Sequence, residues 1–330
     1  MNYIHINEPI SIGPLKLEGR IIMPPLATRK CDENGLVPDE LCDYYSKRAA
    51  NPHVQLIITE HSYITLQGKA NAGQISLADD NCVEGLRRLT DSIHKAGAVT
   101  IAQLNHAGAA AMTEVSGIAS VAPSSQPLPV QPPMGDSLPR ELSVYEIHAI
   151  TEQFVDAALR AKAGGYDGVE IHSAHAYLLN QFYSPLTNHR TDEYGGTLEN
   201  RLRFHREVIR AVRQAVGDDY PIAVRLGAAD YMPGGNTVDD AVEAARILEA
   251  EGIQLLDISG GMCRYTREGH TEAGYFSELS SAVKAAVSIP VILTGGVKRL
   301  SEAETLLAEG AADLIGVGRE LMKDPDWECA

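Results

Sequence analysis

PIAVRLGAADYMPGGNTVDDAVEAARILEAEGIQLLDISGG, residues 221–261, contains the repeat that determines the fold. An apolar run at 221–227 is followed by an amphipathic segment at 238–252 and by a second apolar run at 255–261. Short β-branched runs predict strands, and the segment between them predicts a helix with Thr237 as its N-cap. A strand–helix–strand unit of this kind predicts two parallel strands joined by a helical crossover.

The same alternation extends along the chain. Further helices are predicted at 39–50, 83–98 and 144–165. Eight such units favour an α/β fold of the (β/α)₈ TIM barrel type over a doubly wound open sheet. The remaining predicted strands are 21–27, 54–60, 99–105, 168–174, 290–296 and 314–319.

Two segments fall outside this alternation. Residues 3–20 predict a short N-terminal β-hairpin ahead of the first barrel strand. Residues 122–142 contain too many prolines for a helix or a central strand, so they predict a long loop. Since no linker divides the chain, residues 1–330 are predicted to form a single domain.

The composition limits the possible partners. The net charge of -16 argues against nucleic acid and anionic membranes, although a few local arginines can still bind a small anionic substrate. No signal peptide or membrane span is evident, so a cytoplasmic protein is expected. The five cysteines are scattered without a CxxC pair, which predicts neither a zinc site nor an iron–sulfur domain. A homo-oligomer is possible.

The stretch IHSAHAY, residues 171–177, places polar side chains at the end of the fourth predicted strand. Catalytic residues of TIM barrels lie at the carboxyl ends of the strands. Period-two alternation sends Glu170 and His172 to one face, and His175 and Tyr177 follow in the loop. From the residues alone, the two histidines could bind a metal, hold a substrate oxygen or be ordinary polar residues at the rim.

Other strands also carry polar groups. Gln103 ends the third strand, and Arg225 interrupts the apolar fifth strand. A buried arginine needs a partner, so Arg225 either forms an ion pair, with Glu170 as one candidate, or anchors an electron-rich ligand. Strands seven and eight end in glycines, where a barrel commonly binds phosphate. The residues predicted for that role are Gly295, Gly296, Gly318 and Arg319.

The segment GVEIHSAHAYLLNQFYSPLTNHRTDEYGGTLENRLRF, residues 168–204, resembles the signature of the Old Yellow Enzyme family, the NADH:flavin oxidoreductases. MPPLATR, LIITE, AQLNHAG and VGRELMKDPDW extend the resemblance over nearly the whole chain. It implies an FMN-binding barrel that takes hydride from NADH or NADPH. It also implies reduction of activated C=C bonds in α,β-unsaturated carbonyl compounds.

The resemblance implies a role for each matching residue. His172 and His175 would hydrogen-bond the substrate's carbonyl oxygen, and Tyr177 would donate the proton. FMN would contact Pro25, Leu26, Ala27, His61, Gln103, Arg225, Gly295, Gly296, Gly318 and Arg319. Further substrate contacts would come from Arg29, Arg264, Tyr265 and Tyr275. His106 and the charged residues Arg190, Asp192, Glu199 and Arg201 are expected to be structural.

The chain departs from its relatives at three points. Ala27 stands where many have a threonine or cysteine that hydrogen-bonds the flavin. Arg29 stands near a tyrosine of some bacterial relatives and suggests a more anionic substrate. The chain ends at Ala330, inside the expected eighth helix, whereas larger relatives continue into an iron–sulfur segment.

Three alternatives remain open. One is a flavin enzyme of the same fold that acts on nitro compounds, amines or enoyl-CoA esters. Another is a metal-dependent barrel hydrolase that uses His172 and His175, for which Asp257 is the only obvious further inner ligand. The third is a flavin-binding protein without catalytic activity.

Overall fold

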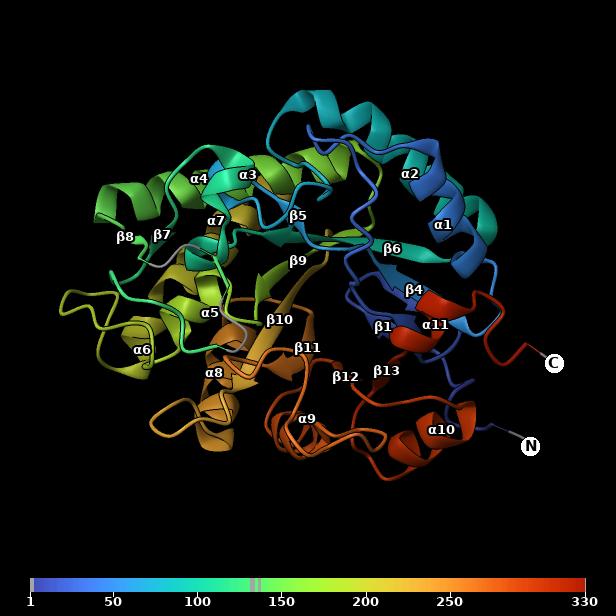
Figure 1. Cartoon of the computed structure of the whole chain (residues 1–330). Helices are drawn as coiled ribbons and strands as arrows, with labels where there is room; N and C mark the ends of the chain where they lie inside the picture. Colours follow the sequence, from blue (N-terminus) through green and yellow to red (C-terminus); the bar gives the residue numbers. More distant parts are fainter. Residues whose placement is uncertain (1–2, 131–133, 136–137, 330) are drawn as a thin grey trace.

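Eight parallel strands form a closed barrel in the computed structural model, which describes residues 3–130, 134–135 and 138–329. The ring runs β4-β3-β13-β12-β11-β10-β9-β6, and β4 pairs with β6 to close it (Figure 1). A short strand, β5 (Ser62–Tyr63), extends the pairing of β6. The barrel strands are β3 (Ile21–Met23), β4 (Val54–Ile58), β6 (Val99–Asn105), β9 (Gly168–Ser173), β10 (Ile222–Ala229), β11 (Leu255–Gly260), β12 (Val291–Thr294) and β13 (Leu314–Gly316).

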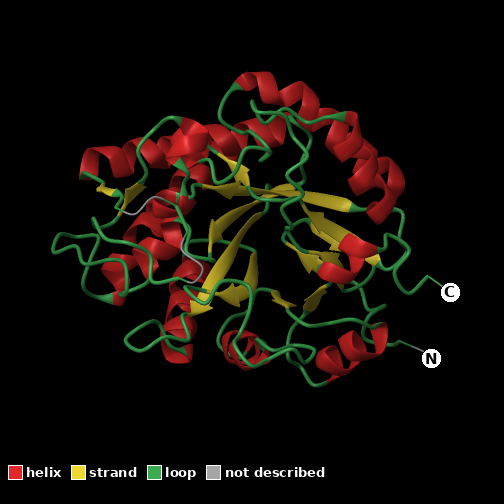
Figure 2. Ribbon diagram, in the orientation of Figure 1, coloured by secondary structure: helices red, strands yellow, loops and turns green. Residues whose placement is uncertain are grey.

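Helices surround the strands, as Figure 2 shows, so the predicted (β/α)₈ barrel is confirmed. The predicted cap of α8 is also confirmed, because the Thr237 hydroxyl accepts from the Asp240 amide and the Asp240 carboxylate accepts from the Thr237 amide. The helices are α1 (Asp39–Ala49), α2 (Val83–Ala96), α3 (Thr113–Ser116), α4 (Val144–Ala163), α5 (Leu178–Tyr183), α6 (Leu198–Arg201), α7 (Arg203–Val216), α8 (Val238–Ala250), α9 (Ser277–Lys284), α10 (Leu300–Ala308) and α11 (Arg319–Lys323).

An apolar layer fills one end of the barrel. The predicted hairpin forms from antiparallel β1 (Ile10–Ile12) and β2 (Leu15–Leu17), and Ile12 and Leu17 pack into this layer. Ile101, Ala223, Leu255 and Ile292 belong to the same cluster. Because strand side chains alternate, the next inward positions on these four strands lie one layer closer to the carboxyl ends. Those positions are Gln103, Arg225, Asp257 and Thr294, so a polar layer follows the apolar one.

Several predicted boundaries were too long. β3 ends at Met23 because Pro24 and Pro25 have no amide hydrogen for the ladder. The helix α11 ends at Lys323, and the residues from 325 to 328 form a turn. The prediction that the helix continues to the end of the chain is therefore wrong for residues 324–329. Ala330 itself lies outside the described residues.

The proline-rich loop at 122–142 contains more order than predicted. Its ends form a short parallel pair of strands, β7 (Val121–Ala122) and β8 (Arg140–Glu141). Residues 131–133 and 136–137 of this loop lie outside the described residues. Among the helices of the described ranges, none is both long and apolar enough to cross a bilayer.

Candidate active site

A cavity of about 850 Å³ opens where the barrel strands end. It collects most of the predicted site residues from segments far apart in the sequence. Gln103 and His172 are buried and do not line it. The predicted residues that line it are Pro25, Leu26, Ala27, Arg29, His61, His175, Tyr177, Arg225, Arg264, Tyr265, Tyr275, Gly295, Gly296, Gly318 and Arg319.

A sharp turn between β9 and α5 presents His175 and Tyr177 to this cavity. His175 and Ala176 adopt φ of 61° and 63°, a left-handed conformation that costs about 1 kcal/mol or more per residue. Two buried amide side chains of α5 hold the turn. Asn180 Oδ1 accepts from the Ala176 amide at 2.8 Å, and Gln181 Nε2 donates to the Ala176 carbonyl at 2.6 Å. Neither Asn180 nor Gln181 was predicted from the sequence to have this positioning role.

The aromatic side chains at the turn form a compact cluster. The His172 ring lies 5.1 Å from the His175 ring and 5.2 Å from the Tyr177 ring, measured between centroids. The His61 ring lies 5.3 Å from that of Tyr177. His175 Nε2 contacts the Ser259 hydroxyl at 2.7 Å, whereas His172 Nδ1 is buried and has no hydrogen-bond partner among the described residues. An orphaned buried nitrogen of this kind is suited to a ligand.

Burial sets the protonation of the cluster. It lowers the pKa of His172 and of His175 well below the usual value, and the nearby positive charge of Arg225 lowers both further. Burial raises the pKa of Tyr177 to about 12, although Arg264 and Arg29 partly oppose this shift. Both imidazoles are therefore neutral and the phenol keeps its proton at pH 7, so each of the three side chains can donate one hydrogen bond.

Arg225 pairs with Asp257 and not with Glu170, which corrects the partner considered from the sequence. The strand register explains this, because β10 and β11 align Arg225 with Asp257, whereas Glu170 of β9 aligns with Ala223. Arg225 Nε lies 3.1 Å from Asp257 Oδ2. Neither atom makes a well-directed hydrogen bond among the described residues, so the guanidinium can still serve a ligand in the cavity.

Glu170 is hydrogen-bonded to the predicted flavin contact Gln103. The Gln103 amide donates to Glu170 Oε1 at 2.8 Å. Burial, and then the negative charge of Asp257, raise the pKa of Glu170 to about 8. Burial also raises the pKa of Asp257 to about 6, although Arg225 opposes this shift. Two buried carboxyl groups, those of Glu170 and Asp257, thus lie behind Arg225, which lines the cavity.

Glycines at the carboxyl ends of β12 and β13 let neighbouring segments of the chain pack closely at the cavity wall. Gly296 has φ of 73°, and a Cβ there would lie 2.0 Å from the Glu272 carbonyl oxygen. At Gly316 a Cβ would lie 2.0 Å from Thr294 Oγ1, a buried hydroxyl without a partner among the described residues. Lys298 and Arg319 carry exposed positive charges beside these turns. This combination of backbone access and positive charge is suited to a phosphate group. Lys298 and Thr294 were not predicted from the sequence.

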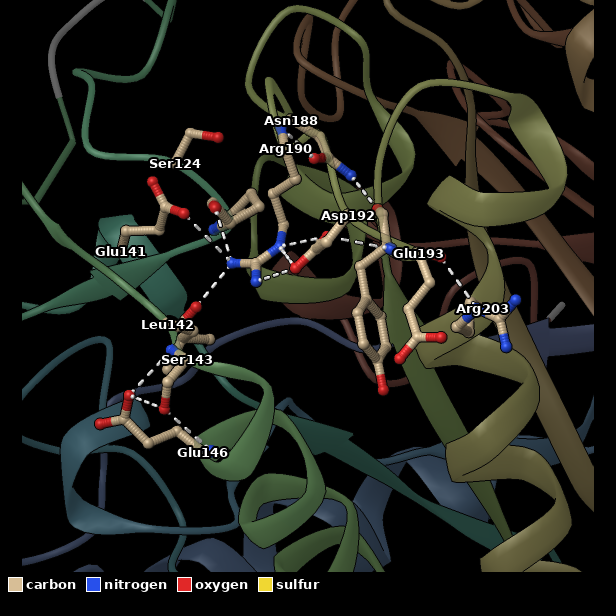
Figure 3. A network of polar contacts seen from close by, with 12 residues as sticks. Ser124, Glu141, Leu142, Ser143, Glu146, Asn188, Arg190, Asp192, Glu193 and Arg203 are labelled. Atoms are coloured by element: carbon tan, nitrogen blue, oxygen red, sulfur yellow. Dashed lines mark hydrogen bonds and ion pairs between the residues drawn. The ribbon is translucent and has the colours of Figure 1, made fainter.

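The charged loop after α5 is fixed by its own contacts, as expected (Figure 3). The Arg190 guanidinium binds the Asp192 carboxylate and donates to the carbonyls of Pro123 and Leu142. Arg201 donates to the carbonyls of Tyr183 and Gly196. These side chains do not line the cavity, and no contact of the Glu199 side chain is among those described.

His106 is buried beside Gly68, where a Cβ would lie 2.7 Å from the imidazole ring. Its Nδ1 accepts from the Gly108 amide at 3.0 Å, and the side chain does not line the cavity. Within the described residues, no group of three or more His, Cys, Asp or Glu side chains has the geometry to hold a metal ion. His172 and His175 thus lack a third ligand of these types there, which argues against the metal-dependent hydrolase alternative.

Comparison with known proteins gives consistent matches over nearly the whole chain. A model of the NADH:flavin oxidoreductase / NADH oxidase family matches residues 5–329. The NADH oxidase of Thermoanaerobacter brockii is 42% identical over 322 residues, which cover 96% of this chain and 49% of that protein. The NADPH dehydrogenase of Geobacillus thermodenitrificans is 37% identical, over 98% of this chain and 92% of that protein. The chain spans about half the length of the first of these relatives.

Solved structures agree with these matches. A 2-naphthoyl-CoA reductase bound to 2-naphthoyl-CoA superposes with a TM-score of 0.92 at 30% identity, over 98% of this chain and 51% of that one. An old yellow enzyme homologue from Zymomonas mobilis superposes with a TM-score of 0.85 at 28% identity, over 97% and 90% of the two chains.

Proposed function

We propose, from the premise that this chain belongs to the NADH:flavin oxidoreductase / NADH oxidase family, that it is an FMN-dependent NAD(P)H oxidoreductase of the Old Yellow Enzyme type. Its substrates are α,β-unsaturated carbonyl compounds, whose activated C=C bond it reduces. One observation carries the choice of substrate: His175 and Tyr177 line the cavity, and the buried His172 ring lies directly behind them, with its centroid 5.1 Å from that of His175 and 5.2 Å from that of Tyr177.

The residues around the cavity fit FMN. Gly296 and Gly318, with Lys298 and Arg319, would hold the phosphate, because the backbone is accessible and the side chains are cationic. Thr294 Oγ1 is a buried polar atom without a hydrogen-bond partner among the described residues, and the Arg225 guanidinium lines the same cavity, so a polar ring edge would contact both side chains. Bound FMN supplies the redox chemistry, accepting hydride from NAD(P)H and delivering it to the substrate.

The protein would stabilise the charge that this transfer creates. When hydride reaches the β-carbon of the alkene, negative charge develops on the carbonyl oxygen. His172 and His175 would each donate a hydrogen bond to that oxygen, in the manner of an oxyanion hole. Tyr177 would then give its proton to the α-carbon, which completes the reduction. Since burial raises the pKa of Tyr177 to about 12, the phenol is fully protonated before the reaction.

Separate measurement of the two half-reactions tests this proposal. Purified protein should bind FMN, and the yellow absorbance should bleach when NADH or NADPH is added without oxygen. In Tyr177→Phe the rate of cyclohexenone reduction should fall by about 10²-fold or more, while flavin bleaching stays within about twofold of the wild type. Tyr145→Phe is the matched control, because Tyr145 lies on α4 and is 82% exposed. This substitution should leave both rates unchanged.

Two results would contradict the proposal. A protein that takes up no FMN would refute the flavin assignment, and an equal slowing of both half-reactions in Tyr177→Phe would refute the proton-donor role. A substrate panel separates the remaining alternative. If a nitro compound, an amine or an enoyl-CoA ester is turned over faster than cyclohexenone, the same site serves a different substrate class.

A further inference from the structure

The cavity is strongly cationic in an acidic protein. Its described lining contains Arg29, Arg225, Arg264, Lys298, Arg319 and Lys323, against a single carboxylate, Glu320. The whole chain has a formal net charge of -16. Positive side chains concentrated in a concave site attract anionic ligands despite an unfavourable total charge. More cations line the cavity than the phosphate of FMN requires.

These cations differ in whether they already have partners. Arg225 lies beside Asp257, and Lys323 pairs with Glu320 at 2.9 Å. Among the described residues, Arg29 and Arg264 form no ion pair, and Arg264 Nε is buried without a hydrogen-bond partner. Lys298 and Arg319 are also without an ion pair there, but they stand beside the phosphate glycines. Arg29 and Arg264 therefore remain for a second anion.

Both arginines lie near the reacting end of the cavity. The Arg264 guanidinium is 5.1 Å from the centroid of the Tyr265 ring, which lies 5.9 Å from the ring of His175. Arg29 lines the cavity together with His61, whose ring is 5.3 Å from that of Tyr177. The charges of Arg264 and Arg29 also lower the pKa of Tyr177 against the larger effect of burial, so both act on that phenol.

The backbone at each arginine is held in an unfavourable conformation. Arg29 has φ of 58° and Arg264 has φ of 64°, which side-chain-bearing residues rarely adopt. The Glu60 carboxylate accepts from the Thr28 amide at 2.7 Å and fixes the first loop. The Arg264 amide donates to the Gly261 carbonyl at 2.9 Å and fixes the second loop. Strain that contacts maintain beside a ligand cavity is typical of functional positions.

We propose that Arg29 and Arg264 bind an anionic group of the substrate, and that the preferred substrates are activated alkenes carrying a carboxylate in addition to the activating carbonyl. This inference rests on the proposed function, since it places the carbonyl oxygen at His172 and His175. The two guanidinium groups then hold the carboxylate at the same end of the cavity. The diphosphate of NAD(P)H has similar chemistry, so the experiment must separate the two sources of negative charge.

Binding of a ketone that cannot be reduced at a C=C bond tests the inference directly. Isothermal titration of FMN-loaded protein would compare 3-oxocyclohexane-1-carboxylate with its methyl ester. The wild type should bind the acid about tenfold more tightly than the ester. Arg29→Gln and Arg264→Gln should each remove most of that preference while ester affinity stays within about twofold. Arg246→Gln is the matched control, because Arg246 lies on α8 in an exposed pair with Glu243.

Equal affinity of the wild type for the acid and the ester would overturn the inference. An equal loss of affinity for both ligands in the two variants would also overturn it. A second arm measures the affinity for NADH and NADPH by anaerobic flavin bleaching. If the variants weaken only the binding of NADH or NADPH and leave the affinity for the acid unchanged, the arginines bind the coenzyme and the inference is wrong. Failure to reduce either the unsaturated acid or its ester would refute the proposed function alone, because the titration does not depend on turnover.

Discussion

His172 and His175 lie in surroundings that disfavour positive charge. Burial lowers the pKa of both imidazoles well below 6.5, and burial raises the pKa of the Tyr177 phenol to about 12. Both histidines are thus neutral at pH 7 and above, and the protonated phenol persists far above neutrality. None of the three groups changes its charge between pH 7 and 9.

The cluster itself is therefore expected to add no pH dependence to alkene reduction in this range, whereas Glu170, whose pKa is raised to about 8 behind Gln103, can add one. Glu170→Gln protein reduced beforehand with NADH would be mixed with cyclohexenone, and the reoxidation rate would be followed from pH 7 to 9. The rate constant should vary by less than about twofold, since neither the cluster nor position 170 titrates there in this variant. An inflection between pH 7 and 9 would show that a group of the cluster titrates and would contradict the assigned roles.

Glu170 should make the flavin-free protein less stable as the pH rises. Its pKa is raised from 4.5 to about 8 in the folded state, by burial first and by Asp257 second. Above pH 4.5 the unfolded chain loses this proton while the folded chain retains it. The stabilisation is therefore complete below pH 4.5 and is lost as pH rises through 8. Asp257, with a pKa raised to about 6, changes stability in the same direction.

Glu170→Gln should remove much of this dependence, because an amide can accept the Gln103 hydrogen bond without ionising. Urea unfolding of flavin-free protein at pH 5 and pH 8 would measure it. The wild type should lose about 3 kcal/mol more than the variant between these pH values. Glu243→Gln, at an exposed position on α8, is the control and should behave like the wild type. Equal losses in all three proteins would contradict the raised pKa.

Two glycines, one in the turn after β12 and one in the turn after α10, have similar backbone conformations but different surroundings. Gly296 and Gly310 have φ of 73° and 74°. A Cβ at Gly296 would lie 2.0 Å from the Glu272 carbonyl oxygen, whereas nothing lies within 4 Å of a Cβ at Gly310. Alanine costs about 1 kcal/mol at either position through the backbone. Only at Gly296 must the neighbouring loop also move.

Gly296→Ala is therefore expected to weaken FMN binding by about tenfold or more, since a backbone shift at the phosphate end displaces several donors together. Gly310→Ala should leave FMN affinity unchanged within about twofold, because only the backbone cost applies there. Quenching of flavin fluorescence during titration of flavin-free protein would give both dissociation constants. Similar affinities in the two variants would place the phosphate elsewhere.

Strands and helices could be predicted from the sequence because their apolar periods are local. The predicted helix at 83–98 corresponds to α2 (Val83–Ala96), and the difference arises because Gly97, with φ of 112°, ends the helix. The partner of Arg225 could not be predicted, since it depends on the register between β10 and β11. The parallel pair β7–β8 was missed for the same reason, because two-residue strands have no period to detect.

Across the whole molecule, the position of the site was easier to predict than its lining. The barrel brings the carboxyl ends of all its strands to one face, so His175, Arg225 and Gly296 could be assigned to one cavity from the fold alone. Lys298 and Thr294 were missed because no local pattern distinguishes them from an ordinary surface lysine or strand threonine. Their role becomes visible only when the chain has folded around the cavity.

The charge of the whole chain and that of the cavity have opposite effects on an anionic reductant. A net charge of -16 repels NADH at long range, whereas the arginines and lysines of the cavity attract it at short range. The screening length falls from about 30 Å at 0.01 M salt to about 10 Å at 0.1 M. Moderate salt therefore removes the repulsion between distant charges before it weakens the attraction inside the cavity.

The rate constant for NADH binding should accordingly pass through a maximum as ionic strength rises. Stopped-flow bleaching of the flavin at limiting NADH should accelerate by about twofold or more between 0.01 and 0.1 M sodium chloride and slow again toward 1 M. The uncharged reductant 1-benzyl-1,4-dihydronicotinamide is the control, and its rate should be nearly independent of salt. A bleaching rate that falls steadily as salt is raised from 0.01 M would contradict this prediction. Repulsion by the acidic surface would then have no measurable effect on the approach of NADH, and attraction by the cavity charges would dominate at every distance.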